Sequence, residues 1–228
     1  MSLFNDFAHL IFPDCCLMCS GSLVKGEKNL CLHCRHNLPF ANYHHQPDNP
    51  LSRRFVGKVP VKYAWAYLKF TKGGRVQNAL HELKYNGKQE MGQLLAHWYG
   101  LELKKWNLQH EMDLIVPVPL HPAKLKKRGY NQCDPIARGL SEALEIAWSP
   151  GALRRNTANR TQTKLGRMER HENTKRIFDV ADQELVANKR ILLVDDVVTT
   201  GATLEACADA LLRAKCKDVS IACLAVAQ

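Results

Sequence analysis

Two adjacent carboxylates lie between a short apolar run and a turn rich in hydroxyl groups. Asp195 and Asp196 follow the apolar residues 191–194 and precede the turn at 199–203. The apolar run predicts a buried strand with the acids at its carboxyl end, where open α/β sheets bind their ligands. Backbone amides of the turn and of the following helix, expected to start near Thr203, would surround a phosphate, and Gly201 would let the backbone approach it. The carboxylates would repel that phosphate, so they suit vicinal sugar hydroxyls or a Mg²⁺ ion carried by the ligand.

A second group of charges follows the apolar run at 114–118. Val118 ends this run and Pro119 follows it, and a proline-stiffened turn then presents four cations, Lys124, Lys126, Lys127 and Arg128. A rigid backbone with concentrated positive charge suits a pyrophosphate group. On composition alone, a solvated basic loop is the simpler interpretation.

Four cysteines near the N-terminus have the spacing of metal ligands. They form two pairs, each with two intervening residues, separated by 11 residues: Cys16, Cys19, Cys31 and Cys34. Two such pairs can supply the four thiolates that a structural Zn²⁺ ion requires. A dithiol redox role, the alternative, would need only one pair beside a thioredoxin-like unit. Cys15 is then a spare, while Cys133, Cys207 and Cys223 lie in apolar surroundings and are predicted to be buried, inert thiols.

The elements that must position these residues alternate between strand and helix. Strand patterns occur at 61–70, 114–118, 191–194 and 219–227, and helical spacing occurs at 75–85, 91–98, 132–147 and 204–212. This alternation predicts an α/β fold with a largely parallel sheet flanked by helices. We expect a small cysteine-rich zinc-ribbon module at 1–45, a polar linker at 46–60 and the α/β domain at 61–228.

A polar segment at 156–176 interrupts this alternation. Long polar loops inside compact domains usually carry function, and this one contains several arginines. From residue 121 to residue 176 there are 13 Lys and Arg against 5 Asp and Glu, which makes +8 of the chain's net charge of +10. This window suits a polyanion, either nucleic acid or a small polyphosphate.

Composition and patterning also bear on location. No run approaches the roughly 18 apolar residues of a spanning helix, so no membrane insertion is expected. The N-terminus lacks the pattern of a secretory signal, and in a reducing cytosol closely paired cysteines indicate metal or redox chemistry rather than disulfides. The sequence therefore predicts a cytoplasmic protein.

Several of these motifs resemble known families. Residues 191–203 are similar to the phosphoribosyl-pyrophosphate motif of type I phosphoribosyltransferases. The run Val-Pro-Val-Pro-Leu-His-Pro, followed by Lys-Lys-Arg-Gly-Tyr-Asn-Gln at 126–132, resembles the ComF/GntX family of phosphoribosyltransferase-like proteins, as do Leu83-Lys84-Tyr85 and the polar stretch from Arg154 to Phe178. Together with the N-terminal cysteines, this resemblance covers nearly the whole chain.

The resemblance implies a type I phosphoribosyltransferase-like fold and an activity. The chain would bind 5-phosphoribosyl-1-pyrophosphate with Mg²⁺ and transfer phosphoribose to an unknown nucleophile, with Asp195, Asp196 and Arg128 as catalytic residues and 156–176 as a hood. The implied ligand site comprises Asp195, Asp196, Val197, Val198, Thr199, Thr200, Gly201, Ala202, Thr203, Val118, Pro119, Lys127 and Arg128. Oxopurine-type members have an aspartate where this chain has Thr199, which argues against purine salvage by their mechanism.

A second function stays open on the same residues. Because ComF relatives are associated with competence, the chain could be a non-catalytic or ligand-regulated DNA-uptake protein. It would then bind single-stranded DNA or DNA-processing proteins through the basic window and the zinc ribbon. However, Tyr130 and Trp148 are the only Phe, Tyr or Trp residues between 121 and 176, which gives few stacking platforms for bases.

Overall fold

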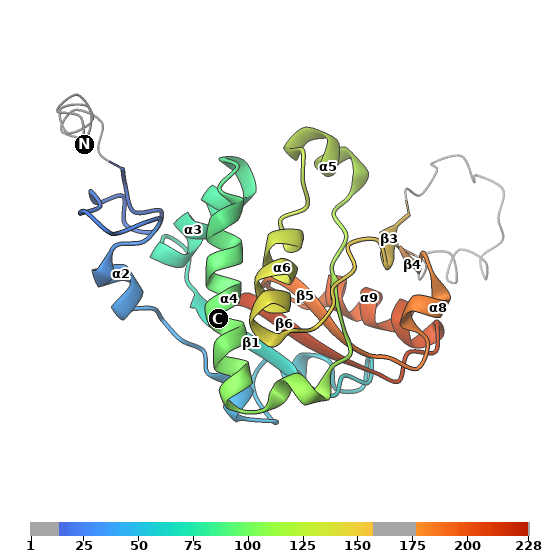
Figure 1. Ribbon diagram of the computed structural model, residues 1–228. Helices are drawn as coiled ribbons and strands as arrows, with labels where there is room; N and C mark the ends of the chain where they lie inside the picture. Colours follow the sequence, from blue (N-terminus) through green and yellow to red (C-terminus); the bar gives the residue numbers. More distant parts are fainter. Residues whose placement is uncertain (1–13, 157–176, 228) are drawn as a thin grey trace.

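A four-stranded parallel sheet forms the centre of the protein (Figure 1). The computed structural model describes residues 14–156 and 177–227. The strands are β1 (Ala64–Phe70), β2 (Leu114–Pro117), β5 (Arg190–Val198) and β6 (Asp218–Ala227), in the order β1-β6-β5-β2. Every neighbouring pair is parallel, which confirms the predicted α/β fold.

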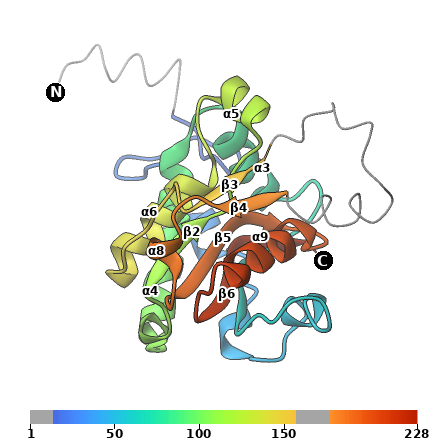
Figure 2. The same ribbon diagram turned by 90° about the vertical axis from the view of Figure 1, so that its right-hand side faces the viewer.

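Helices cover both faces of this sheet (Figure 2). Three lie on one face, namely α3 (Arg75–Tyr85), α4 (Gln89–Lys105) and α6 (Cys133–Leu144), whereas α9 (Ala202–Arg213) lies on the other. The shorter elements are α2 (Leu32–His36), α5 (Pro122–Arg128), α8 (Gln183–Val186), three 3₁₀ turns (Tyr43–His45, Ser52–Arg54 and Leu108–Glu111) and the antiparallel hairpin of β3 (Leu153–Arg155) with β4 (Phe178–Val180).

Residues 191–194 of strand β5 are apolar on both sides of the sheet, and both sides are covered by helices. Leu192 and Val194 pack into the core beneath α4 and α6, whereas Ile191 and Leu193 pack into the core beneath α9. Parallel strands buried on both faces have continuous rather than alternating apolar runs. The short apolar run in the sequence is therefore explained by helices that cover both faces of the strand.

Helices α4 and α6 cross at close range, which fixes the start of α6 over the sheet. A Cβ atom on Gly139 would lie 2.2 Å from the Gln93 carbonyl oxygen, and one on Gly100 would lie 2.5 Å from the Ala143 Cβ. Larger residues at either glycine would force the helices apart. This packing holds the residues that precede α6 next to the end of β5.

Two expectations about segments need correction. Residues 46–60 were expected to be a polar linker, but Leu51, Phe55 and Val59 are buried in the core on the α9 side. The basic residues after Pro122 were expected to form a turn, but they form helix α5, which begins with a proline at its first position and ends at Gly129 in the left-handed conformation. The expected hood lies almost entirely at 157–176, outside the described residues.

None of the helices in the described ranges is both long enough and apolar enough to cross a lipid bilayer.

An ion pair joins the starts of β2 and β5. Arg190 Nε and Nη2 donate to the two carboxylate oxygens of Asp113 at 3.0 and 2.5 Å, and the Arg190 amide donates to the same carboxylate at 2.8 Å. The side chains of Asp113 and Arg190 are 29% and 28% exposed. Hydrogen bonds from Arg190 hold the pKa of Asp113 well below its usual range.

Replacing Asp113 with Asn should therefore destabilise the sheet, by about 1–3 kcal/mol in urea unfolding at pH 7, because charge-assisted bidentate bonds are lost. An aspartate whose pKa is depressed by folding stabilises the fold above its unfolded pKa of about 3.9 and loses that effect as the pH falls. The difference between wild type and Asp113→Asn should thus shrink below about pH 4.

Asp209→Asn is a suitable control for this measurement. Its pair with Arg213 spans 3.1 Å, but the two side chains are 49% and 42% exposed. Such surface pairs contribute little, so a change below about 0.5 kcal/mol is expected. Equal effects of the two substitutions would contradict the role given to Asp113.

Candidate functional site

The two acids of the sequence motif lie within strand β5 rather than after it. The strand was expected to end at Val194, but it continues to Val198 because β6 is long enough to pair with it, with Val198 opposite Val226. Successive side chains of a strand point to opposite sides. Asp195 and Asp196 therefore have different surroundings.

Asp196 is buried and forms an ion pair with a lysine from α3. Its side chain is 5% exposed and contacts the Lys84 ammonium, which is 22% exposed. Lys84 lies in the last turn of α3, far from β5 in the sequence. Sequence reasoning used Lys84 only as part of a family motif, and no local pattern indicates its partner.

Asp195 lies against α6. The Cys133 thiol, at the first position of α6, donates to Asp195 Oδ1 at 3.3 Å, and the Asp196 amide donates to the same oxygen at 2.9 Å. Desolvation by the surrounding protein, followed by the charge of Asp196, raises the pKa of Asp195 to about 8. Burial beside a second carboxylate thus favours the protonated form of Asp195 in the unliganded chain. Cys133 is buried, as predicted, and its burial raises the pKa of its thiol.

The turn after β5 has exposed hydroxyl groups and a left-handed glycine. Thr199 and Thr200 are exposed, and Gly201 has φ +87° immediately before α9, which begins at Ala202. A Cβ atom on Gly201 would lie 3.3 Å from the Phe55 ring. The helix start is one residue before the expected Thr203, so the first free amides of α9 lie at the turn.

Arg54 ties this turn to the end of the sheet. Its guanidinium donates to the Thr199 carbonyl through Nη1 and to the Ala227 carbonyl through Nη2, the latter at 2.8 Å. Phe55, the next residue, packs against Gly201. Both residues belong to the segment expected to be a linker, so sequence reasoning missed them.

The cations of α5 line a cavity that adjoins the acids. This cavity has a volume of about 540 Å³ and is lined by Lys84, Tyr85, Gly87, Lys124, Lys127, Arg128 and Tyr130. Lys84 faces the cavity and also pairs with Asp196. The structure therefore brings together two of the motifs that the sequence placed in one site.

Arg128 and Val118 are positioned by neighbours in the same region. The Arg128 guanidinium lies 5.4 Å from the centre of the Tyr85 ring, and its Nη1 donates to Gln132 Oε1. The Val118 amide donates to the Val194 carbonyl at 2.8 Å, which places Val118 and the following Pro119 beside the residue that precedes Asp195.

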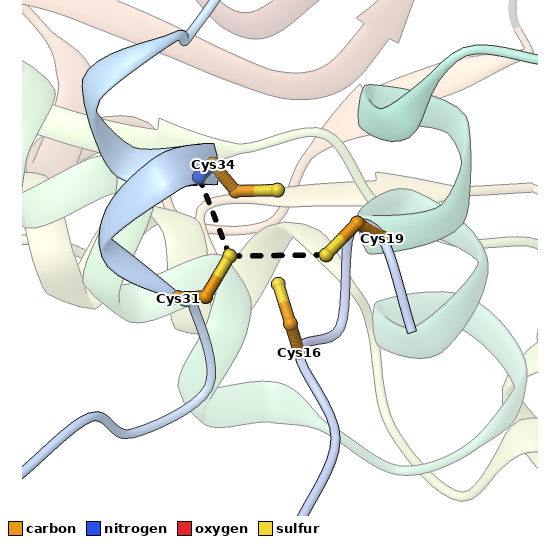
Figure 3. A group of neighbouring side chains, drawn as sticks. All are labelled: Cys16, Cys19, Cys31 and Cys34. Carbon is orange, nitrogen blue, oxygen red and sulfur yellow. Dashed lines mark hydrogen bonds between the residues drawn. The ribbon is translucent and has the colours of Figure 1, made fainter. Parts of the chain in front are cut away.

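The four N-terminal cysteines form one cluster. Figure 3 shows the sulfur atoms of Cys16, Cys19, Cys31 and Cys34 facing one another, and all four lie within 4.8 Å of each other. The sulfurs of Cys19 and Cys31 are 3.7 Å apart, close to the ~3.8 Å expected between thiolates in a tetrahedron with metal–sulfur bonds of about 2.3 Å. The cluster could hold a metal ion.

The cysteine cluster is docked on the α/β domain. Asn78 of α3 donates to the Met18 carbonyl at 2.9 Å, and the Arg35 guanidinium lies 4.7 Å from the centre of the Trp98 ring on α4. Burial alone would raise the pKa of Cys16, but backbone amides, foremost that of Cys31, lower it to about 7. Burial raises the pKa of Cys34, so without a metal ion the surroundings favour the thiolate at Cys16 but not at every member of the cluster.

The fold and the acid–turn–helix arrangement define a phosphoribosyltransferase-type domain, and a family model described as "Phosphoribosyl transferase domain" matches residues 131–228. The chain is 32% identical over 216 residues to the DNA utilization protein YhgH of Escherichia coli (strain K12), covering 92% of this chain and 88% of that protein. It is 28% identical to Competence protein F of Haemophilus influenzae, covering 83% and 86%. The chain belongs to the ComF family of phosphoribosyltransferase-like proteins, as its motifs implied.

Among solved structures, a purine phosphoribosyltransferase from Pyrococcus horikoshii Ot3 aligns with 59% of this chain and 73% of its own, at 21% identity and a TM-score of 0.36.

The different surroundings of the two acids predict opposite effects of the same substitution. Because folding raises the pKa of Asp195 far above its unfolded value of about 3.9, the charged form costs stability, and this cost grows as the pH rises from about 4 to 8. Asp195→Asn should then raise the free energy of unfolding by about 1–2 kcal/mol at pH 8.5 and by less at pH 5. Asp196→Asn should lower it by about 1–3 kcal/mol, because Lys84 loses its buried partner.

Urea unfolding of both variants at the two pH values measures these effects. A shift of the same sign for both, or an Asp195→Asn effect that does not change with pH, would contradict the assignment of the proton to Asp195.

Proposed function

We propose that this protein binds 5-phosphoribosyl-1-pyrophosphate with Mg²⁺ and transfers its phosphoribosyl group to a nucleophile. The observation that carries the proposal is the direct succession of Asp195 and Asp196, the turn at 199–201 and the start of α9, with a cationic cavity adjoining through Lys84. One strand end thus offers groups for each part of a sugar diphosphate ester.

Each part of the ligand matches different groups of the protein. The free amides at the start of α9, together with the hydroxyls of Thr199 and Thr200, suit the terminal phosphate. The carboxylates of Asp195 and Asp196 suit the ribose hydroxyls, and the Mg²⁺ ion that accompanies the pyrophosphate would favour loss of the Asp195 proton. Lys127 and Arg128 in the cavity suit the pyrophosphate.

The charge balance of α5 supports an anionic ligand. Within the parts of the chain that the structure describes, no carboxylate forms an ion pair with Lys124, Lys126, Lys127 or Arg128. The positive charge of the cavity is therefore left for a ligand. As the bond from the ribose C1 to pyrophosphate breaks, Arg128 would stabilise the charge that develops on the leaving group.

In this proposal Lys84 contacts different groups in the unliganded and the liganded protein. Before binding it neutralises Asp196, and it already lines the cavity. Once the ligand engages the acids, the lysine ammonium can turn toward the pyrophosphate without leaving the site. Asp196 would then exchange the lysine ammonium for hydrogen bonds from the ribose hydroxyls.

Calorimetric titration of the purified chain with the magnesium complex of the ligand tests the proposal. The wild type should bind, and the double variant Asp195→Asn, Asp196→Asn should bind at least about 100-fold more weakly, because two partners of the ribose are lost. Asp209→Asn, a surface acid on α9, serves as the control and should bind as the wild type does. No binding by a folded wild type would refute the proposed ligand.

A role in DNA handling is the second candidate, favoured by the names of the relatives in Escherichia coli and Haemophilus influenzae and by the exposed lysines of α5. The same variants separate the two functions. Binding of single-stranded DNA that weakens with salt and survives the double substitution would support DNA handling. Pyrophosphate release on addition of acceptors, lost in the double variant, would support transfer.

We further propose that the cysteine cluster holds a structural Zn²⁺ ion and that the protein works in the cytoplasm, where these thiols stay reduced. Cys16→Ser with Cys19→Ser should remove one equivalent of zinc, measured by mass spectrometry of the metal, and lower the melting temperature, because the bound ion stabilises the segment. Cys15→Ser, an exposed neighbour, should keep the metal. Unchanged zinc in the double variant would exclude the cluster as the site.

A further inference from the structure

We propose a second metal site, at which His44, His45 and Glu102 bind a Zn²⁺ ion that ties the 3₁₀ turn Tyr43–His45 to helix α4. One donor atom from each of these three side chains lies within 4.8 Å of the other two. Two imidazoles and a carboxylate form a ligand set that Zn²⁺ accepts with one position left for water. The site is independent of the sugar-phosphate ligand and of the cysteine cluster.

The unpaired ring of His44 is the strongest support for this site. The residue is 8% exposed, and among the described residues neither Nδ1 nor Nε2 has a hydrogen-bond partner. A buried polar atom without a partner costs about 1–3 kcal/mol. Native proteins rarely keep such groups, and an ion is one of the few explanations for them.

The turn that presents the two histidines is held in place by Asn49. This buried side chain donates from Nδ2 to the carbonyls of Tyr43, Gln46 and Ala64 at 3.3, 2.8 and 3.0 Å. Its Oδ1 accepts from the amides of Leu51 and Ser52 at 2.9 and 3.0 Å. The backbone between Tyr43 and the start of β1 is therefore fixed before any ion binds, which lowers the entropy cost of binding.

Glu102 lies on α4, and its carboxylate has one interaction that would compete with metal binding. Its Oε2 accepts from Lys105 at 2.8 Å, and the two side chains are 34% and 70% exposed. Exposed pairs of this kind are weak, so a metal ion can displace the lysine. Bonds of about 2.0–2.2 Å to Zn²⁺ require donor atoms about 3.4 Å apart, and the exposed His45 and partly exposed Glu102 can move that far.

The alternative is a purely aromatic cluster. The ring centres of His44 and Tyr99 are 5.7 Å apart, and those of His45 and Trp106 are 4.4 Å apart. These contacts account for the burial of the His44 ring, since aromatic pairs pack at such distances. They give neither ring nitrogen a partner, whereas a bound ion would pair one of the two, and they do not involve the Glu102 carboxylate.

Metal content and a cobalt spectrum test the proposal on the untagged full chain. The wild type should hold one equivalent of zinc more than His45→Gln or Glu102→Gln, and the two variants should bind zinc at this site at least about 100-fold more weakly. With Co²⁺ in place of Zn²⁺, thiolates give a sulfur-to-metal charge-transfer band. Imidazole and carboxylate ligands give only the weaker visible bands, and these should diminish in the variants while the charge-transfer band stays.

Glu145→Gln is the matched control, since Glu145 is also an exposed carboxylate paired with a lysine, Lys104, at 2.6 Å. It should retain the full metal content. Circular dichroism establishes that the surface variants are folded. If wild type, both variants and control hold the same amount of zinc and show the same cobalt spectrum, the proposal is overturned, whereas failure of the cysteine cluster to bind would appear separately as a missing charge-transfer band.

Discussion

Two adjacent carboxylates held inside a buried parallel strand impose the main constraint on this structure. Side by side in a low-dielectric setting, Asp195 and Asp196 cannot both be charged without compensation. The fold meets this requirement in two ways, because Lys84 neutralises Asp196 and burial raises the pKa of Asp195, which favours its protonated form. Helix α3 must therefore end beside β5, and α6 must begin beside it. The close crossing of α4 with α6 keeps the start of α6 in place. The site is costly to the unliganded fold, as binding sites often are.

The segment before β1 has a larger structural role than its composition indicates. Asn49 hydrogen-bonds the backbone before and after its own position. Leu51 and Phe55 fill the core beneath α9, and Arg54 donates a hydrogen bond to the turn after β5. A turn that binds phosphate through its amides needs a fixed backbone, because the cost of ordering it would otherwise reduce affinity. The segment that joins the cysteine module to the sheet is thus also the support of the candidate ligand turn.

The sequence predicted those parts of the fold and site that depend on local pattern. The parallel sheet, the acid–turn–helix succession at 195–203 and the paired cysteines all follow from neighbouring residues, and the structure shows each of them. The features that the sequence could not predict depend on residues that come into contact only in the folded chain. Three such features are the ion pair of Lys84 with Asp196, the hydrogen bond from Arg54 to the Thr199 carbonyl, and the proximity of His44 to Glu102. The extension of β5 to Val198 likewise depends on the length of its partner strand, which no pattern within β5 records.

The charges of the site follow one rule: negative groups are neutralised before binding, whereas positive groups are not. Lys84 neutralises Asp196 and burial favours the protonated form of Asp195, but the cations of α5 have no carboxylate partner within the described parts of the chain. A region of uncompensated positive charge beside a neutralised acid pair attracts a polyanion from a distance and leaves the acids available at short range. Nucleic acid would satisfy the cations and leave the acid pair unused, whereas a sugar diphosphate would engage both. The link that Lys84 makes between the acid pair and the cationic cavity is therefore the feature that favours the smaller ligand.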